Sequence, residues 1–542
     1  MRQKIGADAG APVAGSEAVA GDGRPAHHPT PLMPPRVAHA ARAAEAHVAG
    51  QPWVVPPVAA RRAPVRPVAS QAHKVVSAPA NLPLATSPIR RSLIQGPQLI
   101  ALTFAIMIGL GTLALMLPGI MRDGRMMSPV DALFMATSAV CVTGLATVNL
   151  ADEMTFAGQA VILVLIQAGG LGIVTLSAIF LVILRQRLGL ASQDALVETF
   201  TPSGGGGLPR LLKRIIVTMF LAEALGAVLL FALVPHADGL LWQAWAGIFH
   251  SVSAFCNAGF SLHSRGLMEW GNNHAALAVV MGLIVAGGLG FFVLNDVRRR
   301  LKGHTRTLAL QSKLVIVTTA LLIPGGAVLL WLAEHNYSMQ VARLGLGDSL
   351  FHALFQSITA RTAGFNTLDI GQMSDFGLTI LIVLMLVGGG PGSCAGGIKT
   401  TTMAVAIFTV VAHLRGREDT EIFGRRVPRT IVQRSFIIIS VLLMFIAVTF
   451  VLLRVANLYE PLPIAPGERP HDLVPLAFEV VSAACTVGLS ADFTRRLSEA
   501  GKVIIALLMF AGRLGPLTLA IALVSARTSA RYRLAEERVM VG

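Results

Sequence analysis

Apolar and polar residues alternate in four similar blocks between residues 96 and 527. In each block a long apolar stretch is followed by a short one that ends near a glycine, and then by a second long stretch. About 20 apolar residues cross a bilayer as a helix, so the long stretches predict eight membrane-spanning helices. The first helix of each block is expected at 99–117, 211–234, 312–332 and 431–453, and the second at 156–184, 274–297, 376–411 and 500–525.

The short stretches between the predicted spans are near repeats of one another. They read SAVCVTGL (138–145), SAFCNAGF (253–260), SITARTAGF (357–365) and SAACTVGL (482–489), and their central glycines are 115, 105 and 124 residues apart. They are too short to cross the membrane, so we expect them to be re-entrant and surrounded by protein or water. The repeat predicts an all-α integral membrane protein, in which four tandem helix–pore loop–helix repeats surround a central pore with pseudo-fourfold symmetry.

The four glycine loops have the chemistry of a cation selectivity filter. Such a filter turns backbone carbonyl groups toward an axis, and glycine permits the positive-φ conformations that let consecutive carbonyls do so. The small or β-branched residues before each glycine suit an extended backbone. The predicted ion-binding residues are Val142, Thr143 and Gly144; Asn257, Ala258 and Gly259; Thr362, Ala363 and Gly364; and Thr486, Val487 and Gly488.

Each second helix carries a glycine motif, which begins at residue 169, 287, 388 or 512. Small residues in a membrane helix usually serve close packing, and we expect that role for the first two motifs. The third motif begins the run GGGPGSCAGGIKTTT (388–402), which cannot stay helical. Non-helical backbone at membrane depth lines a cavity, so we predict a mobile gate beneath the filter. The gating residues are Gly388, Gly389, Gly390, Pro391, Gly392, Ser393, Gly396, Gly397 and Lys399.

Two arginines and three cysteines lie close to these motifs. Arg513, inside the fourth second helix, is costly in a membrane and therefore expected to be functional. It either faces the pore as an electrostatic barrier or hydrogen-bonds glycine-loop carbonyls. Arg361 is expected to be paired or to reach the outer surface. Cys141, Cys256 and Cys485 each precede a loop glycine by three residues and are expected to pack as buried apolar side chains, with a metal or redox site as the alternative.

Composition and charge support a polytopic membrane protein. Of 542 residues, 54% are hydrophobic and only 13% are charged, and the mean hydropathy is +0.66. The net charge of +15 does not indicate nucleic-acid binding, because the basic residues cluster in short loops beside apolar spans. Their distribution places both termini in the cytoplasm. The predicted organisation is a disordered basic tail (1–95), four repeats (96–190, 208–302, 310–415 with the gate, and 428–527) and a C-terminal cytoplasmic tail (528–542).

The loops ending in VTGL, NAGF, TAGFN and TVGL, the break GGGPGSCAGGIKTTT and the segment GRLGPLT resemble the Trk/Ktr/HKT superfamily of potassium transporters, and the chain is most similar to its KtrB branch. The resemblance covers about residues 97–527. It implies potassium uptake across the plasma membrane, with K+ bound at Gly144, Gly259, Gly364 and Gly488, and glycine at position 144 favours K+ over Na+. It further implies a gate at 388–400, a regulatory arginine at Arg513, and a homodimer on a cytosolic ring of RCK-type nucleotide-binding subunits. No cofactor is expected within this chain, and Na+ remains open as a coupling or activating ion.

Two other classes of protein stay open at this point. An alternating-access carrier for another cation such as sodium would also use broken helices, although such folds usually have inverted repeats, whereas the four blocks share one orientation. An enzyme would need clustered His, Asp or Glu within the spans. The predicted spans are almost free of them, and Glu223, the main exception, is expected to serve helix packing or to lie at the interface. We therefore do not expect an enzyme.

Overall fold

The computed structural model describes residues 96–171, 208–234, 239–337, 344–456, 458–459 and 473–515. These residues form a helical fold, and their only sheet is a two-stranded antiparallel hairpin. Strand β1 (Glu421–Ile422) pairs with β2 (Arg425–Arg426), with Glu421 opposite Arg426. The tails predicted at 1–95 and 528–542 lie outside the described residues, as do the ends of the spans predicted at 156–184 and 500–525.

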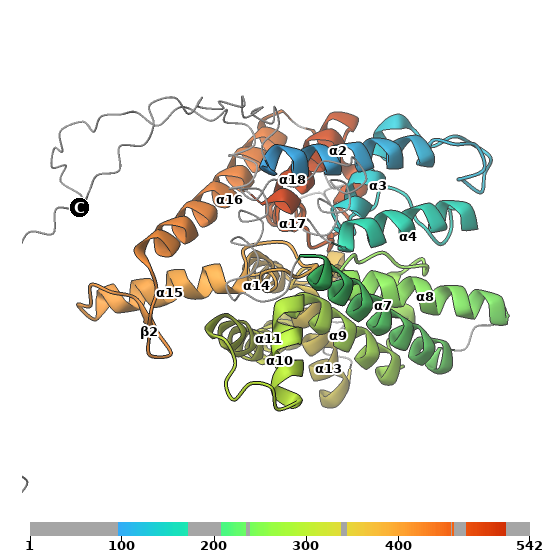
Figure 1. Cartoon of the computed structure of the whole chain (residues 1–542). Helices are drawn as coiled ribbons and strands as arrows, with labels where there is room; N and C mark the ends of the chain where they lie inside the picture. Colours follow the sequence, from blue (N-terminus) through green and yellow to red (C-terminus); the bar gives the residue numbers. More distant parts are fainter. Residues whose placement is uncertain are drawn as a thin grey trace, which may run out of the picture. The chain divides into compact units, whose positions relative to one another are not determined.

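The helices follow the order of the apolar stretches (Figure 1). The first long helices are α2 (Gly96–Leu115), α7 (Leu208–Leu233), α11 (Leu310–Tyr337) and α16 (Arg429–Val455). The short helices before the glycine loops are α3 (Pro129–Val140), α8 (Leu240–Cys256), α13 (Leu346–Thr359) and α17 (Leu473–Ala484). The later helices are α4 (Phe156–Gly170), α9 (His274–Leu289), α10 (Phe291–Leu301), α14 (Asp375–Leu386), α15 (Thr400–Leu414) and α18 (Glu499–Leu514). Three 3₁₀ turns, η1 (Gly266–Trp270), η2 (Ile370–Gln372) and η3 (Thr494–Arg496), follow the second, third and fourth loops.

A polar N-cap begins each helix that follows a glycine loop. The side-chain oxygens of Thr155, Asn273, Ser374 and Ser498 accept hydrogen bonds from the backbone N–H three residues later. These bonds satisfy one of the free donors at the start of α4, α9, α14 and α18. The sequence therefore marks the same boundary four times.

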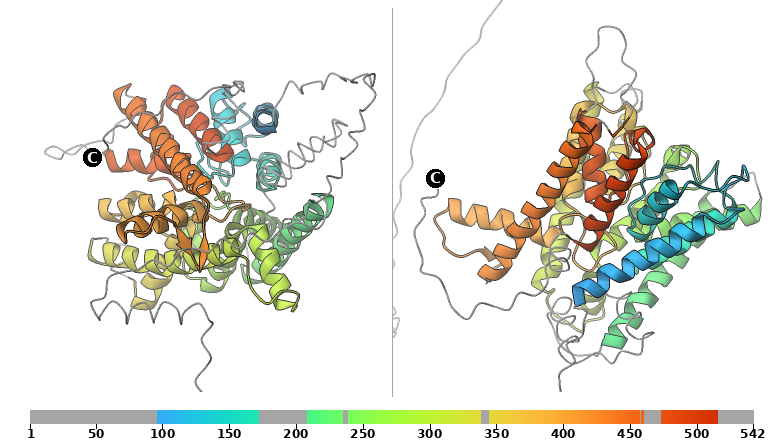
Figure 2. Two further views of the ribbon diagram at one scale, coloured as in Figure 1. Left: turned by 60° about the vertical axis from the view of Figure 1, so that its left-hand side comes forward. Right: turned by 90° about the horizontal axis from the view of Figure 1, so that it is seen from above.

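The helices pack in a cyclic order. Each short helix contacts the long helix before it: α3 contacts α2, α8 contacts α7, α13 contacts α11, and α17 contacts α16. Each short helix also contacts a helix of the preceding block, because α4 packs on α8, α9 on α13, α14 on α17, and α18 on α3. The last of these contacts joins the C-terminal block to the first one and closes the cycle. Figure 2 shows α16, α17 and α18 on the same side of the helical assembly as α2 and α3.

The helix predicted at 274–297 is not one straight helix, and this expectation was wrong. Helices α9 and α10 meet at an angle of 100°. Gly290 lies at the bend with φ 93° and ψ 144°, and the N–H of Phe291 bonds to the carbonyl oxygen of Gly392 at 3.1 Å. A contact from a distant glycine-rich segment thus replaces the helical hydrogen bond.

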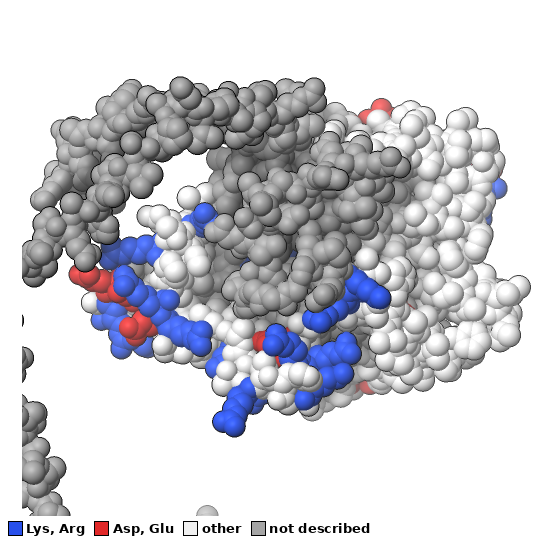
Figure 3. Space-filling view, viewed as in Figure 1, with Lys and Arg blue, Asp and Glu red and all other residues white. Residues whose placement is uncertain are grey.

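Within the described residues, three helices are long and apolar enough to cross a membrane, or four if the bent pair α9 and α10 counts as one span. They are Lys213–Leu233, Leu310–His335 and Arg429–Val455. The predicted spans at 156–184 and 500–525 are described only in part, and the break after α14 divides another. Figure 3 shows a surface almost free of charge on the side of α7 and α8, as expected of helices that face lipid.

Lysine and arginine gather at one side of the view in Figure 3. They belong to the end of α10 and to the segment around the β-hairpin, and include Arg298, Arg299, Arg300, Arg415, Arg425 and Arg426. They are among the basic residues in short loops from which the sequence analysis predicted the cytoplasmic side of the membrane.

Candidate ion pathway at the glycine ring

The four loop glycines meet in a closed ring. We use the name glycine ring for Gly144, Gly259, Gly364 and Gly488. A methyl group added to each glycine would touch the backbone oxygen of the residue just before the next ring glycine. These oxygens belong to Ala258 for Gly144, Ala363 for Gly259, Val487 for Gly364 and Thr143 for Gly488. The distances from the added carbon are 2.5 Å to Ala258 O, 2.8 Å to Ala363 O and 2.6 Å to Val487 O, too short for any side chain.

All four ring glycines have a positive φ, between 72° and 101°. An added side chain would therefore be excluded by backbone strain as well as by lack of space. This geometry explains why these four positions require glycine, as expected from the sequence. Loops that are separated by more than a hundred residues in sequence thus share one contact point, which lies at the junction of α3, α8, α13 and α17.

The residue two positions before each ring glycine has a left-handed backbone. The φ values are 53° for Val142, 59° for Asn257, 69° for Thr362 and 49° for Thr486. The extended backbone expected for these positions is wrong, because the chain must turn sharply out of the short helix before it reaches the ring. The turn is fixed by backbone bonds from Thr143 N to Ser138 O (2.8 Å) and from Val487 N to Ser482 O (2.8 Å).

This left-handed backbone is strained, since three of the four residues are β-branched. Such a residue at positive φ is an outlier that costs on the order of 1–3 kcal/mol. Because the positive-φ backbone recurs at four equivalent positions, it is a property of the ring as a whole and not of one loop. Strain of this kind concentrates at functional sites.

Glycines of the following helices pack against the ends of the short helices. A methyl group on Gly169, Gly287 or Gly512 would overlap the carbonyl oxygen of Val140, Phe255 or Ala484, which lies four residues before a ring glycine. The expectation of close packing is thus met for the first and second motifs, and it extends to the fourth. The third motif is different, because Gly388 contacts Gly396 of its own segment.

The segment between α14 and α15 is a non-helical break, as predicted for 388–399, whereas residues 400–402, also predicted to be non-helical, form the start of α15. We call residues 387–399 the glycine-rich break. It folds back on itself through a parallel bridge between Val387 and Ile398, with Gly388 N bonded to Ile398 O at 2.9 Å. It docks on the second block, where Gly390 N bonds to Gly288 O at 2.8 Å.

The far arm of the glycine-rich break touches the loops beneath the glycine ring. Gly396 N bonds to the Thr362 hydroxyl at 3.2 Å, and a methyl group on Gly396 would overlap the Thr486 hydroxyl oxygen. Thr362 and Thr486 lie two residues before ring glycines. The break therefore contacts two of the loops at the same level, directly next to the ring.

Arg513 is buried and holds the glycine-rich break to the first block. Its Nη1 donates to Cys394 O at 2.5 Å and its Nη2 donates to Gly169 O at 2.7 Å. Its acceptors are carbonyl oxygens of the break and of α4, not of a glycine loop, so the expected bond to the loops is not observed. Arg361, which was expected to be paired or exposed, is buried and donates from Nη2 to Gly388 O at 3.2 Å.

The cysteines and Glu223 serve packing between helices. All four cysteines are free and buried, as expected of small apolar side chains. The carboxylate of Glu223 on α7 accepts from Gln167 Nε2 at 3.0 Å and from Cys256 Sγ at 3.6 Å. It therefore joins α7 to α4 and α8, which agrees with the packing role expected for it.

Three buried polar residues behind the loops were missed by the sequence analysis. His250, Gln356 and Glu479 lie in α8, α13 and α17, and each is no more than 1% exposed. Each bonds to the chain that leaves its glycine loop toward the next helix. Their spacing was a usable signal, because His250 and Glu479 both stand nine residues before a ring glycine and Gln356 stands eight residues before one.

The fold and the ring define a helical membrane transport protein, and comparison with known proteins agrees. Residues 76–533 match the model of the TrkH family, described as a cation transport protein. This chain belongs to that family, so the expected relationship to Trk and Ktr proteins is confirmed. The family and its named relatives are transporters rather than enzymes.

Similar proteins cover most of the chain. The potassium/sodium uptake protein NtpJ of Enterococcus hirae is 37% identical over 448 residues, which are 82% of this chain and 97% of NtpJ. The Ktr system potassium uptake protein B of Vibrio alginolyticus is 38% identical over 427 residues, 78% of this chain and 90% of that protein. The crystal structure of the potassium transporter TrkH from Vibrio parahaemolyticus has the same fold, with a TM-score of 0.61 at 20% identity over 80% of this chain and 86% of that one.

Proposed function

We propose that this protein takes up K+ across the plasma membrane through the glycine ring, which acts as a selectivity filter. The closed ring is the observation that carries the proposal. Four backbone segments approach one point at which no side chain fits, so carbonyl groups are the polar atoms available to replace an ion's hydration shell. The names of NtpJ and of the Ktr protein support potassium as the ion.

The proposed architecture is four membrane-spanning repeats around this pathway, eight spans in all. The cyclic packing of the short helices, each between two blocks, supports such an arrangement. With the basic segments on the cytoplasmic side, both termini lie in the cytoplasm. The short helices then point their C-terminal, partially negative ends toward the centre of the membrane, where they favour a cation.

The glycine-rich break is proposed as the gate. Its contacts with Thr362 and Thr486, next to the ring, support a position in which it would close the proposed pathway. Arg513 and Arg361 hold it there through backbone carbonyls. The Ktr relatives are named as parts of a system, which supports a partner protein. The proposed assembly is a homodimer with a cytosolic nucleotide-binding subunit of the RCK type as that partner.

Ion uptake into liposomes that contain the full chain tests the proposal. K+ and Rb+ should enter in preference to Na+. Gly364→Ser should remove this preference, because the side chain would lie against Val487 O at a positive φ. Gly109→Ser on α2, where an added carbon meets no atom within 4 Å, is the matched control and should keep it. Equal uptake of Na+ and K+ by the unmodified chain would instead support a sodium carrier.

A further inference from the structure

Glu479 is an acidic side chain that lies entirely inside the protein, directly behind the fourth glycine loop. It is 0% exposed and belongs to α17. Its Oε2 accepts from Ser490 Oγ at 2.7 Å, and its Oε1 accepts from the Thr494 hydroxyl. Burial of a carboxyl group is costly unless its oxygens are hydrogen-bonded, and both oxygens here have a hydroxyl partner.

Both hydroxyl partners belong to the segment that leaves the fourth loop. Ser490 follows Gly488 by two residues, and its Oγ also accepts from Phe493 N at 3.2 Å and from Thr494 N at 3.4 Å. Glu479, Ser490 and Thr494 therefore form a closed group that ties one turn of backbone to the short helix. We call residues 489–494 the outgoing segment of the fourth loop.

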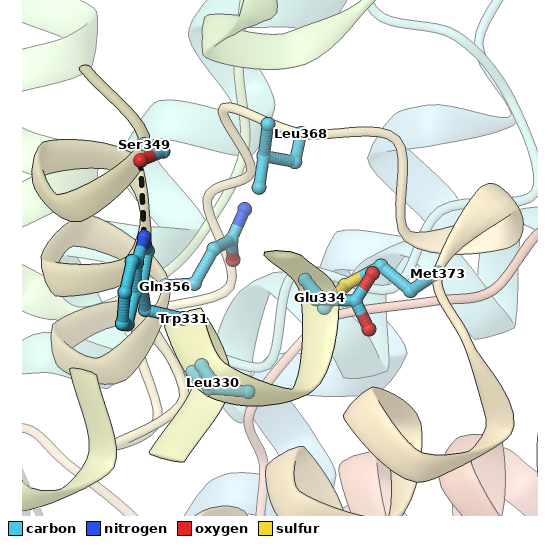
Figure 4. Close-up of a pocket in the computed structure, with 8 residues that line it drawn as sticks. Leu330, Trp331, Glu334, Ser349, Gln356, Leu368 and Met373 are labelled. Atoms are coloured by element: carbon cyan, nitrogen blue, oxygen red, sulfur yellow. Dashed lines mark hydrogen bonds between the residues drawn. The ribbon is translucent and has the colours of Figure 1, made fainter. Parts of the chain in front are cut away.

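The same support appears behind the second and third loops with different side chains. His250 Nε2 bonds to Ser261 Oγ at 3.0 Å, and Ser261 follows Gly259 by two residues, as Ser490 follows Gly488. The nitrogen of the Gln356 amide is drawn toward Leu368 in Figure 4; with the amide's oxygen and nitrogen exchanged, the oxygen accepts from the N–H groups of Thr367 and Leu368 at 3.2 Å. Figure 4 shows Gln356 between Leu368 and Trp331, beside a cavity of about 10 Å³.

The first loop departs from this pattern. Met135 occupies the position nine residues before Gly144, and a methionine accepts no such hydrogen bond. The outgoing chain is held from another helix, because Gln159 of α4 donates to Leu150 O at 3.0 Å. A buried side chain thus supports the outgoing chain of each loop, and in the fourth loop that side chain is the carboxyl group of Glu479.

We propose that Glu479 is a positioning residue for ion selection. It fixes the outgoing segment of the fourth loop, and thereby the distance of the Gly488 carbonyl from the other three loops, without touching the ion. This inference rests on the proposed function of the glycine ring. A fourth loop that is held less firmly admits ions of more than one size. Replacing Glu479 should therefore change the selectivity and not only the rate of uptake.

The test measures the ratio of Na+ to K+ uptake in liposomes for variants of the full chain. Glu479→Met, which copies Met135, removes both hydrogen bonds of the carboxyl group and should raise this ratio by about tenfold. Glu479→Gln keeps one acceptor and should give an intermediate ratio. Ser490→Ala removes the hydrogen bond between Ser490 and Glu479 from the side of the loop. It should raise the ratio as much as Glu479→Gln does. The double variant Glu479→Met/Ser490→Ala should have the same ratio as Glu479→Met, because the methionine already removes the bond to Ser490.

Glu499→Gln is the matched control, because it removes a carboxylate from the first turn of α18 outside the group and should leave the ratio unchanged. Suppose that Glu479→Gln raises the Na+ to K+ uptake ratio as much as Glu479→Met does, while Ser490→Ala leaves it unchanged. This result would overturn the positioning role of Glu479 in favour of a purely electrostatic one. Unchanged ratios in both Glu479→Met and Ser490→Ala would also overturn it. If Glu479→Met does not fold, Ser490→Ala and Thr494→Val decide. A failure of the proposed function is recognised separately, since the unmodified chain would then not prefer K+.

Discussion

Arg513 and Cys394 join the fourth block to the glycine-rich break, with Arg513 Nη1 donating to Cys394 O at 2.5 Å. The second bond of the same guanidinium, to Gly169 O, ties this contact to the first block. One side chain therefore connects three parts of the molecule that are far apart in sequence. Because Cys394 lies in the middle of the proposed gate, this contact stabilises the closed position.

Replacing Arg513 should favour the open gate. A hydrogen bond to a charged group contributes about 1.5–3 kcal/mol, so Arg513→Gln should raise K+ uptake about tenfold. Arg513→Lys should raise it as well, because a single ammonium group does not reproduce the planar fork that reaches two carbonyls. Uptake into liposomes checks both. If Arg513 were only an electrostatic barrier, the lysine variant would behave like the unmodified chain.

Gly396→Ala should displace the glycine-rich break from beneath the ring. The added methyl group would overlap the Thr486 hydroxyl and lie 2.5 Å from Cys485 O, so the closed position becomes inaccessible. K+ uptake should rise several-fold. Gly282→Ala on α9 is the matched control, because its methyl group meets no atom within 4 Å. Unchanged or lower uptake by a folded Gly396→Ala protein would argue against the break as a gate.

The ion pair between Asp131 and Lys502 should stabilise the protein in a pH-dependent way. Lys502 Nζ lies 2.8 Å from Asp131 Oδ1 and joins α18 to the first turn of α3. Burial disfavours the ionised carboxylate, but hydrogen bonds from Lys502 and Ser128 outweigh it, so the pKa of Asp131 lies below its usual value. A lowered pKa stabilises the fold above the unfolded-state pKa of about 3.9, and this stabilisation is lost as the pH falls through the folded-state value.

Lys502→Gln should therefore lower the melting temperature at pH 7 by about 1–2 °C, as expected for a partly buried ion pair. The difference from the unmodified chain should begin to shrink below the unfolded-state pKa of about 3.9 and disappear below the lowered folded-state pKa of Asp131. Thermal unfolding in detergent at several pH values measures it. Lys313→Gln, an exposed lysine of α11, should have no effect at any pH. A difference that stays constant as the pH falls below about 3.9 would mean that the ion pair is not its cause.

The sequence was sufficient to predict the parts of this fold that depend on local residue types. Glycine and proline are poor helix formers, so the break at 387–399 could be found within a long apolar stretch. The four loops could be found because the ring requires glycine at each one. Apolar length indicated the helices on either side.

The features that depend on distant contacts could not be predicted. From the sequence, Gly290 looks like a glycine for helix packing. The bend between α9 and α10 depends on the hydrogen bond from Phe291 N to the carbonyl oxygen of Gly392, which is distant in sequence. The β-branched residues Val142 and Thr486 favour extended backbone locally, but the turn into the ring imposes a positive φ. The role of Glu479 required the outgoing segment of its own loop to fold back on α17.

A cation should bind on the axis of the glycine ring, and crystals soaked in Rb+ show whether it does. Anomalous scattering locates Rb+ without reference to transport rates or gating. We expect a peak surrounded by carbonyl oxygens of the four loops at Gly144, Gly259, Gly364 and Gly488, which weakens when K+ competes. Rb+ bound elsewhere in the membrane region, with no peak at the ring, would contradict this expectation.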